Sequence, residues 1–322
     1  MTRIVVAYLA KAKYGGWPSF TMHLCAALRA CGCEPVVRTL GARTAPMPRQ
    51  FGYGLMCRRL ALDDLTAMRD PVLIAAADKD HAEAAMALVQ RGALIVVHDP
   101  AEKHLAGIDH SRCIVIRQSM KARMHASTFI PHPYRRTYQD TGTPLHERAA
   151  PVCQARIDFD KHTDKVLEAC DLGSDIRCVG AANPMYVFHK LRPRWPGFAV
   201  KPFDTAAGSG AALCRQASAT VDMSAIAGDG GGSQYSFMEA WDAGSPLIIN
   251  RKWIDGLAPD EMRHGWNCLA AATGQEIHDS LRLLNRDPEL ASRLVANGEA
   301  SLRDHDPHVI GSQYRAMLLG LS

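Results

Sequence analysis

Short apolar runs alternate with helix-like segments along the first part of the chain, and this alternation restricts the possible folds most strongly. The apolar runs have the length of strands and lie at Ile4–Leu9, Glu34–Leu40, Val72–Ala77, Leu94–Val97, Cys113–Ile116 and Phe129–Ile130. The helix-like patterns begin near Pro18, Leu60, His81, Pro100 and Ser119. Strands that alternate with helices form parallel sheets with helices on their faces. Residues 1–134 are therefore predicted to form an α/β, Rossmann-like, doubly wound domain.

The same pattern restarts after a polar stretch over residues 135–150, which contains Thr141-Gly142-Thr143-Pro144 and is predicted to be a linker. New apolar runs follow at Val152, Ile176–Val179, Thr220–Met223 and Leu247–Ile249. We predict a second Rossmann-like domain over residues 151–305 and a last helix, 306–322, that packs back on the first domain. The two sheets are expected to face each other across a cleft, with the site where strand ends converge.

Composition allows a soluble two-domain protein, because 322 residues with 47% hydrophobic and 22% charged residues are ordinary for globular chains. The apolar runs are far shorter than the about 20 residues that cross a bilayer, so no membrane insertion is expected. No signal peptide is visible. The ten cysteines show neither a CxxC pair nor a zinc-like grouping, which favours reduced thiols in the cytoplasm.

Two cations five residues apart follow the first strand of the second half. Arg156 and Lys161 lie in ARIDFDK, after the short apolar stretch from Pro151 to Ala155. At the carboxyl end of a strand, a planar guanidinium and a mobile ammonium suit one diphosphate without a metal ion. The alternative is an ordinary surface ion pair with Asp158, Asp160 or Asp164.

Two glycine-containing turns also suit an anionic ligand. In the second half, Gly230, Gly231, Gly232, Ser233 and Gln234 precede a helix that contains Glu239. Glycines let backbone N–H groups approach an anion, and a helix N-terminus favours negative charge. Near the start, Gly15 and Gly16 precede a helix beginning near Pro18, and Lys13 and Tyr14 stand beside them. This turn lacks the GxGxxG dinucleotide fingerprint.

The order of these motifs resembles the GT-B glycosyltransferases of family four. R-x4-K at Arg156 and Lys161 is followed by E-A-x-x-A-G-x-P from Glu239 and then by DPELASRLVANG. In the first half, Gly15-Gly16, the strand-end His98-Asp99 and the segment FIPHP fit the same family. One departure concerns the acid that the family places eight residues before Glu239, where this chain has Gly231.

This resemblance implies a retaining transferase that takes a hexose from a nucleotide-diphosphate sugar, with a UDP-sugar such as UDP-glucose as the expected co-substrate and no cofactor. Arg156 and Lys161 would stabilise the leaving diphosphate, Glu239 would bind the ribose, and His98 would contact the transferred sugar. Asp99 is a candidate acceptor-side base. The expected donor-binding residues are Gly15, Gly16, Arg156, Lys161, Gly230, Gly231, Gly232, Ser233, Gln234 and Glu239.

The distribution of charge along the chain indicates what kind of acceptor to expect. Residues 1–150 carry 20 Lys and Arg against 12 Asp and Glu, a net +8, whereas the remainder carries 17 against 21, a net −4. Since the family's N-terminal domain shapes the acceptor site, a basic first half suits an anionic acceptor such as DNA. The candidate acceptor contacts are Lys13, Tyr14, Arg58, Arg59 and Arg135. The alternative is that these cations are simply solvated.

The leading acceptor hypothesis is a hydroxymethylated pyrimidine in DNA, such as hydroxymethylcytosine, because the compact chain looks like the phage-type DNA glycosyltransferases. Such an enzyme would work in the host cytoplasm and would need a flipped or exposed base. The alternatives are transfer to a polysaccharide, a lipid-linked glycan or a small metabolite. A GT-B-shaped binding protein without transfer activity is the third alternative, suggested by Gly231.

Overall fold

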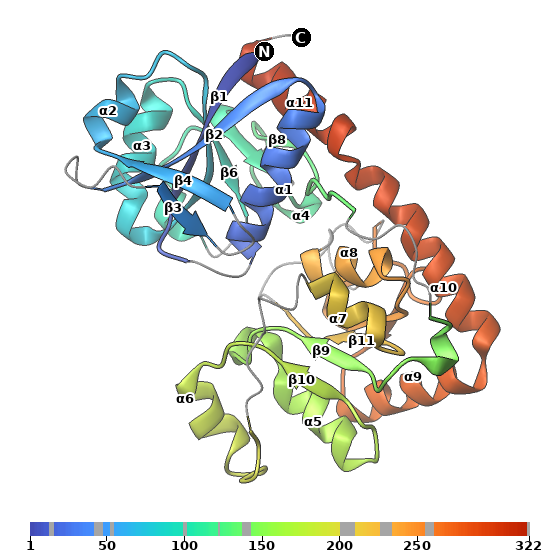
Figure 1. Cartoon of the computed structure of the whole chain (residues 1–322). Coiled ribbons are helices and arrows are strands. Elements are labelled where there is room, and N and C mark those ends of the chain that lie inside the picture. The colour runs from blue at the N-terminus through green and yellow to red at the C-terminus, as the bar shows by residue number, and fades with distance from the viewer. Residues whose placement is uncertain are drawn as a thin grey trace. The chain divides into compact units, whose positions relative to one another are not determined.

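The protein forms two compact units, Met1–Arg135 with Asp304–Ser322, and Arg136–Arg303 (Figure 1). Its structure is a computed structural model. The described residues are 1–12, 16–41, 48–51, 55–98, 102–121, 123–136, 143–199, 210–225, 234–254 and 261–320. Among them no helix is both long enough and apolar enough to span a bilayer. All ten cysteines are free thiols.

The first unit contains an eight-stranded sheet with the order β3-β4-β2-β1-β5-β6-β7-β8. Its strands are β1 (Thr2–Leu9), β2 (Cys33–Leu40), β3 (Pro48–Phe51), β4 (Leu55–Leu60), β5 (Val72–Ala77), β6 (Leu94–Val97), β7 (Cys113–Val115) and β8 (Thr128–Phe129). Its α-helices are α1 (Gly16–Ala30), α2 (Leu62–Thr66), α3 (Ala82–Gln90), α4 (Gln118–Lys121) and α11 (Pro307–Leu319). The chain runs outward from β1 in both directions, and right-handed crossovers therefore place α1 and α3 on opposite faces (Figure 1).

The second unit contains a five-stranded parallel sheet with the order β10-β9-β11-β12-β13. Its strands are β9 (Val152–Gln154), β10 (Arg177–Val179), β11 (Thr220–Asp222), β12 (Leu247–Asn250) and β13 (Leu269–Ala271). Its α-helices are α5 (Thr163–Asp171), α6 (Pro184–Tyr186), α7 (Gly210–Gln216), α8 (Tyr235–Asp242), α9 (Gly274–Arg286) and α10 (Pro288–Ser301). Helix α5 packs against α9, and α8 packs against α7 and α10. The prediction of two doubly wound α/β sheets is confirmed.

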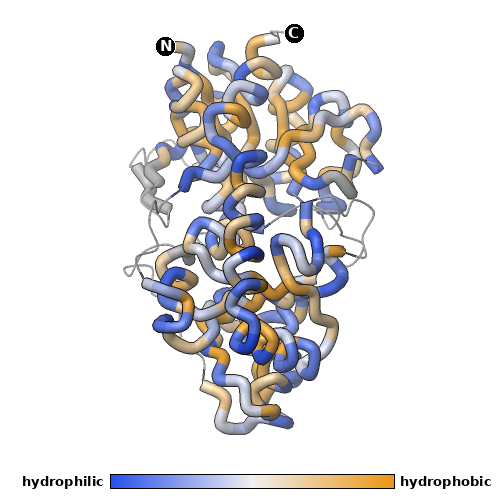
Figure 2. The backbone as a smooth tube through the Cα atoms, turned by 90° about the vertical axis from the view of Figure 1, so that its right-hand side faces the viewer, coloured by the Kyte–Doolittle hydropathy of each residue, from blue (hydrophilic) through white to orange (hydrophobic). Residues whose placement is uncertain are grey.

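The hydrophobic pattern explains why these strands are central. Residues Ile4–Leu9 of β1 are fully buried, because β1 lies between β2 and β5 and both sheet faces are covered. Val152, Val221 and Ile248 form the corresponding core of the second sheet. Figure 2 shows hydrophobic segments alternating with hydrophilic ones along the chain. Each unit thus builds its own core from strands that read as continuous apolar runs.

Strands β3 and β4 differ from the sequence prediction. We expected a helix to begin near Leu60 and no strand between residues 40 and 60, but Pro48–Phe51 pairs antiparallel with Leu55–Leu60 at the sheet edge. Prolines and glycines around this segment disfavour a helix, and the charged Arg58 and Arg59 are compatible with an edge region. The helix that follows begins only at Leu62.

The last helix returns to the first unit and packs on α1. Gly311 is buried in this contact, and an added Cβ there would collide with the backbone carbonyl of Ala27. The chain leading into the helix is bonded to the same unit, because Tyr134 N–H donates to the His305 carbonyl over 2.9 Å. His305 Nδ1 lies 2.7 Å from the carbonyl oxygen of His132, which can only accept.

Gly311→Ala tests this close approach. Alanine in a helix gains about 0.5–1 kcal/mol over glycine, but overlap with a backbone atom cannot be relieved by a side-chain rotation. We expect a net loss of about 1–3 kcal/mol in the free energy of unfolding, measured by denaturant titration. Gln313→Ala, at an exposed position of the same helix, is the control and should change stability little. Equal stability of the two variants would contradict the tight α1–α11 contact.

Candidate functional site

The segment between β9 and α5 holds the two predicted cations. Arg156 follows β9 closely, and a 3-10 turn, η6 (Phe159–Lys161), leads into α5. Asp158 fixes the start of this turn, because its Oδ1 accepts from the Phe159 N–H over 2.8 Å and from Asn183 Nδ2 over 2.9 Å. His162 then closes the turn in the left-handed conformation, with φ 47°. The loop is thus held by local backbone and side-chain bonds.

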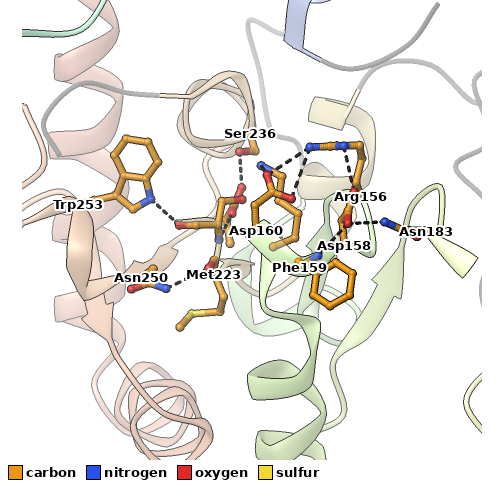
Figure 3. Close-up of polar contacts among 12 residues, drawn as sticks. Arg156, Asp158, Phe159, Asp160, Asn183, Met223, Ser236, Asn250 and Trp253 are labelled. Atoms are coloured by element: carbon orange, nitrogen blue, oxygen red, sulfur yellow. Dashed lines mark hydrogen bonds and ion pairs between the residues drawn. The ribbon is translucent and has the colours of Figure 1, made fainter. Parts of the chain in front are cut away.

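The structure brings Arg156 and Lys161 to one carboxylate, that of Asp160. Figure 3 shows Arg156 beside Asp158 and Asp160. Arg156 Nη1 donates to Asp158 Oδ2 over 3.1 Å, and its Nη2 donates to Asp160 Oδ2 over 3.2 Å. Lys161 Nζ lies 3.5 Å from the same Asp160 Oδ2. Arg156 is half-exposed, whereas the Lys161 side chain is only 14% exposed. Of the three ion-pair partners considered from sequence, Asp158 and Asp160 are therefore real contacts, whereas Asp164 accepts from the Tyr186 hydroxyl over 2.7 Å.

The carboxyl ends of β11 and β12 meet this loop. Asp222, the buried last residue of β11, accepts from the Ser224 N–H over 2.8 Å and from the Ser236 hydroxyl on α8. Ala225 N–H donates to the Asp160 carbonyl over 2.8 Å, which ties η6 to the segment after β11. On the other side, Trp253 Nε1 donates to the Ser224 carbonyl over 2.7 Å (Figure 3). The loop with the two cations is therefore bonded to the segment after β11, which is in turn bonded to Trp253 after β12.

Glu239 on α8 forms a second polar cluster with Gln154, the last residue of β9. Gln154 Nε2 donates to Glu239 Oε2 over 3.1 Å and lies 3.0 Å from Cys214 Sγ. A side chain at Gly210, the first residue of α7, would collide with both the Glu239 carboxylate and the Gln154 amide. Burial raises the pKa of Glu239 to about 8, and the like charges of Asp242 and Asp222 act in the same direction. The hydrogen bond from Gln154 opposes this increase.

Three side-chain atoms in this region are buried and have no hydrogen-bond partner among the residues that the structure describes. They are Gln154 Oε1, Ser224 Oγ and Gln234 Nε2. Gln154 ends β9, which Arg156 follows, Ser224 follows β11, and Gln234 precedes α8. A buried polar group without a partner costs roughly 1–3 kcal/mol, so such groups commonly have a ligand or water partner. Acceptors and a donor at one sheet edge therefore suit a polar ligand.

The predicted residues of the first unit lie in different surroundings. The His98 ring is buried against Phe20, and its Nε2 lies 2.7 Å from the Ala75 carbonyl, which accepts and therefore places a proton on Nε2. Gly16 is the first residue of α1. The backbone N–H of Arg135 donates to His23 Nδ1 over 2.9 Å.

Arg58 and Arg59 are neighbours in β4, so their side chains point to opposite faces of the sheet. Arg58 is paired in register with Arg38 of β2. Burial lowers the pKa of Arg38, and the nearby charges of Arg3 and Arg58 lower it further. Arg59 packs its aliphatic stem on Gly41. Of these two arginines, Arg58 lies near the cations Arg3 and Arg38, with Asp70 beside them.

Several predicted site residues lie outside the described part of the chain. These are Lys13, Tyr14, Gly15, Asp99, Gly230, Gly231, Gly232 and Ser233. Within the described part, no group of three or more His, Cys, Asp or Glu side chains is placed to hold a metal ion.

The sequence reasoning missed Gln154, Asp222, Ser236 and Gly210. A usable signal was present for Gln154 and Asp222, since each is a polar residue that ends an otherwise apolar strand. Strand-end polar residues of a parallel sheet converge at one edge and commonly form its binding site. Nothing local distinguishes Ser236 or Gly210, because their roles arise from partners 14 and more residues away.

Two doubly wound parallel α/β units in one chain, with a polar site at the strand ends, define the GT-B fold, and the structural neighbours are glycosyltransferases of this fold. The chain is similar to Anabaena Alr3699/HepE in complex with UDP and glucose, with a TM-score of 0.73 and 12% identity over 100% of both chains. An alpha-glucosyltransferase in complex with UDP and DNA containing an HMU base gives a TM-score of 0.69 and 10% identity over 98% of this chain and 99% of that one. Sucrose-phosphate synthase from Thermosynechococcus elongatus gives a TM-score of 0.72 and 15% identity, over 100% of this chain and 99% of that one. No family model and no curated protein matches the sequence.

The raised pKa of Glu239 gives a test through stability. A folded-state pKa of about 8 lies above the usual carboxyl value of 4.5, so between these pH values the folded state binds more protons than the unfolded one. The free energy of unfolding should therefore fall as pH rises from 5 to 8 and then level off. In Glu239→Gln this component should vanish, a difference on the order of 3–4 kcal/mol across the range.

The measurement is a series of denaturant titrations between pH 5 and pH 9, with Glu289→Gln on the exposed side of α10 as the matched control. The control should keep the wild-type pH profile. Parallel profiles for wild type and Glu239→Gln would mean that Glu239 titrates normally in the folded protein.

Proposed function

We propose that the protein is a retaining glycosyltransferase that moves a sugar from a UDP-sugar to a hydroxyl acceptor. The observation that carries this proposal is the full-length likeness to glycosyltransferases solved with UDP, combined with the cation pair that follows β9. The likeness to the structure with UDP and glucose covers 100% of the 322 residues of this chain. We assign a role to each site residue from its position at the strand ends and from the chemistry of its side chain.

In the proposed reaction, Arg156 and Lys161 bind the diphosphate and stabilise the negative charge that develops on it as the sugar leaves. Such fixed cations act mainly by preorganised electrostatics and positioning. No cofactor or metal ion is part of the proposal, because the two cations supply the charge. Glu239 accepts hydrogen bonds from the ribose hydroxyls, and Gln154 holds its carboxylate in place. The raised pKa keeps Glu239 largely protonated near neutral pH, and the carbonyl oxygen of its carboxyl group still accepts from a ribose hydroxyl.

The remaining contacts are proposed from sequence position. Gly15 and Gly16, with the segment from Gly230 to Gln234, would bring backbone N–H groups to the donor. His98 and Asp99 would face the transferred sugar and the acceptor hydroxyl. The Nε2 of His98 donates to the Ala75 carbonyl, which fixes the orientation of this ring.

The proposed acceptor is a hydroxymethylated pyrimidine in DNA. Two observations support it: the net +8 of the first 150 residues, and the likeness to an alpha-glucosyltransferase in complex with DNA. The cluster of Arg3, Arg38 and Arg58 is where phosphate contacts would be strongest. Lys13, Tyr14, Arg59 and Arg135 complete the proposed acceptor surface. This activity would belong to the cytoplasm, or to the host cytoplasm for a phage enzyme.

Transfer to a carbohydrate or small metabolite is the second candidate function. The likeness to sucrose-phosphate synthase, at 15% identity and a TM-score of 0.72, favours it. Both candidates use the same donor residues, so they differ only in the acceptor surface.

Release of free UDP from a panel of UDP-sugars, with and without duplex DNA containing hydroxymethylcytosine or hydroxymethyluracil, tests both candidates. We expect DNA-dependent release, and a gain of one hexose mass on the modified nucleoside after digestion. Lys161→Ala should lower turnover by a factor of about 100 or more, as expected for removal of a transition-state charge contact. Lys165→Ala, on the neighbouring helix α5, is the control. Sugar turnover without DNA modification would favour the second candidate, and no turnover with any sugar would contradict the proposal.

The acceptor surface is tested by separating the two arginines of β4. Arg58→Ala should weaken binding to duplex DNA by about five-fold and reduce the salt dependence of the affinity by about one unit of slope, because one phosphate contact is lost. Arg59→Ala, on the other face of the sheet, should have a smaller effect. Both variants should bind UDP normally, which calorimetry would check. Equal losses in both would contradict the role given to the Arg58 cluster.

A further inference from the structure

Asp160 occupies an unusual place between the two cations of the proposed diphosphate site. Its Oδ2 is 3.2 Å from Arg156 Nη2 and 3.5 Å from Lys161 Nζ. The backbone carbonyl of Asp160 accepts from Ala225 N–H over 2.8 Å, which holds the residue at the junction of η6 and the segment after β11. One carboxylate oxygen therefore bridges a guanidinium and an ammonium that come from opposite ends of a six-residue motif.

Asp158 contacts the same arginine but is held differently. Its carboxylate accepts from Phe159 N–H and from Asn183 in addition to Arg156, and its side chain is 18% exposed. For Asp160, in contrast, the ion-pair partners among the described residues are Arg156 and Lys161, and its side chain is 31% exposed. Asp158 is thus bound into the turn, whereas the Asp160 carboxylate is held mainly by the two cations.

We propose that Asp160 is an internal substitute for a phosphate group: its carboxylate takes the place of a phosphate oxygen between Arg156 and Lys161, and the diphosphate of the ligand displaces it. This proposal rests on the proposed function, since it concerns the same site. A carboxylate and a phosphate oxygen are both acceptors for these cations, and two anions do not share the position without repulsion. Displacement requires only a side-chain rotation, because the backbone of Asp160 stays bonded to Ala225.

Two consequences follow for a transferase. Without ligand, Asp160 neutralises two cations that would otherwise repel each other at a partly buried position. With ligand, its negative charge remains next to the diphosphate and lowers the affinity for both UDP-sugar and UDP. A transferase must release UDP after each cycle, so the same carboxylate that weakens donor binding would speed product release.

The experiment compares Asp160→Asn with Asp158→Asn, which each remove one negative charge next to Arg156 at constant side-chain size. Binding of UDP and, separately, of inorganic pyrophosphate is measured by calorimetry at low salt. We expect Asp160→Asn to bind both ligands about five-fold more tightly, the strength of one exposed ion pair, with the gain shrinking at high salt. Asp158→Asn should bind them more weakly, because the turn that positions Arg156 loses its anchor.

Thermal unfolding gives an independent measurement. In a buffer without multivalent anions, Asp160→Asn should unfold at a lower temperature than wild type, and pyrophosphate should raise its unfolding temperature more than that of wild type. Unchanged or weaker ligand binding in Asp160→Asn, in a protein with wild-type circular dichroism, would overturn the proposal, as would tighter binding in both variants.

These outcomes also separate the proposal from the proposed function. If pyrophosphate binds and Asp160→Asn binds it more tightly, while UDP and UDP-sugars show no binding, the role of Asp160 stands and the glycosyltransferase proposal fails. If UDP binds to wild type and Asp160→Asn binds it no more tightly, the glycosyltransferase proposal stands and the role of Asp160 fails. If neither ligand binds either protein, both proposals are overturned.

Discussion

The parallel pairing of β9, β11 and β12 is the constraint on which the site depends. In a parallel sheet the carboxyl ends of neighbouring strands meet at one edge, so residues far apart in the sequence become neighbours there. Gln154 ends β9, Asp222 ends β11 and Asn250 ends β12, and each makes side-chain bonds at that edge. The short loops that follow are then fixed by these bonds. A slip in strand register would move every one of these groups away from its partner.

Charge at this edge is divided between a buried acidic side and a more exposed basic side. Asp222 and Asp242 are buried, and their like charges add to the larger effect of burial, which raises the pKa of Glu239. Asp242 is compensated by Arg136, whose Nε donates to it over 3.0 Å. Arg156, by contrast, is half-exposed and is balanced by Asp158 and Asp160. The exposed pairs contribute little to stability, about 0–1 kcal/mol each, and so leave Arg156 available to an anionic ligand at low energetic cost.

The sequence predicted those parts of the structure that depend on periodicity. Apolar runs identified β1, β2, β5, β6 and the strand ends around Arg156, because burial on both faces leaves a strong local pattern. Strands β3 and β4 were not predicted, since strands near a sheet edge contain polar residues and lack a continuous apolar run. Their position depends on the pairing of the two strands with each other. The resemblance in motif order indicated the fold, which the structure confirms, but the contacts of Gln154, Gly210 and Ser236 depend on packing between α7, α8 and β9. No local pattern encodes such packing.

The two chain connections between the units are anchored at both sides. On the side of the first unit, Tyr134 is bonded to His305, so the residues just before the first connection and just after the second are neighbours. On the side of the second unit, Arg136 contacts Glu299 over 2.9 Å, which again joins residues next to the two connections. Each unit therefore holds both of its connections together without help from the other unit. Helix α11 begins just after His305 and packs on α1, so the chain ends on the unit in which it began. The strand-end geometry of the second unit is likewise fixed by bonds within that unit.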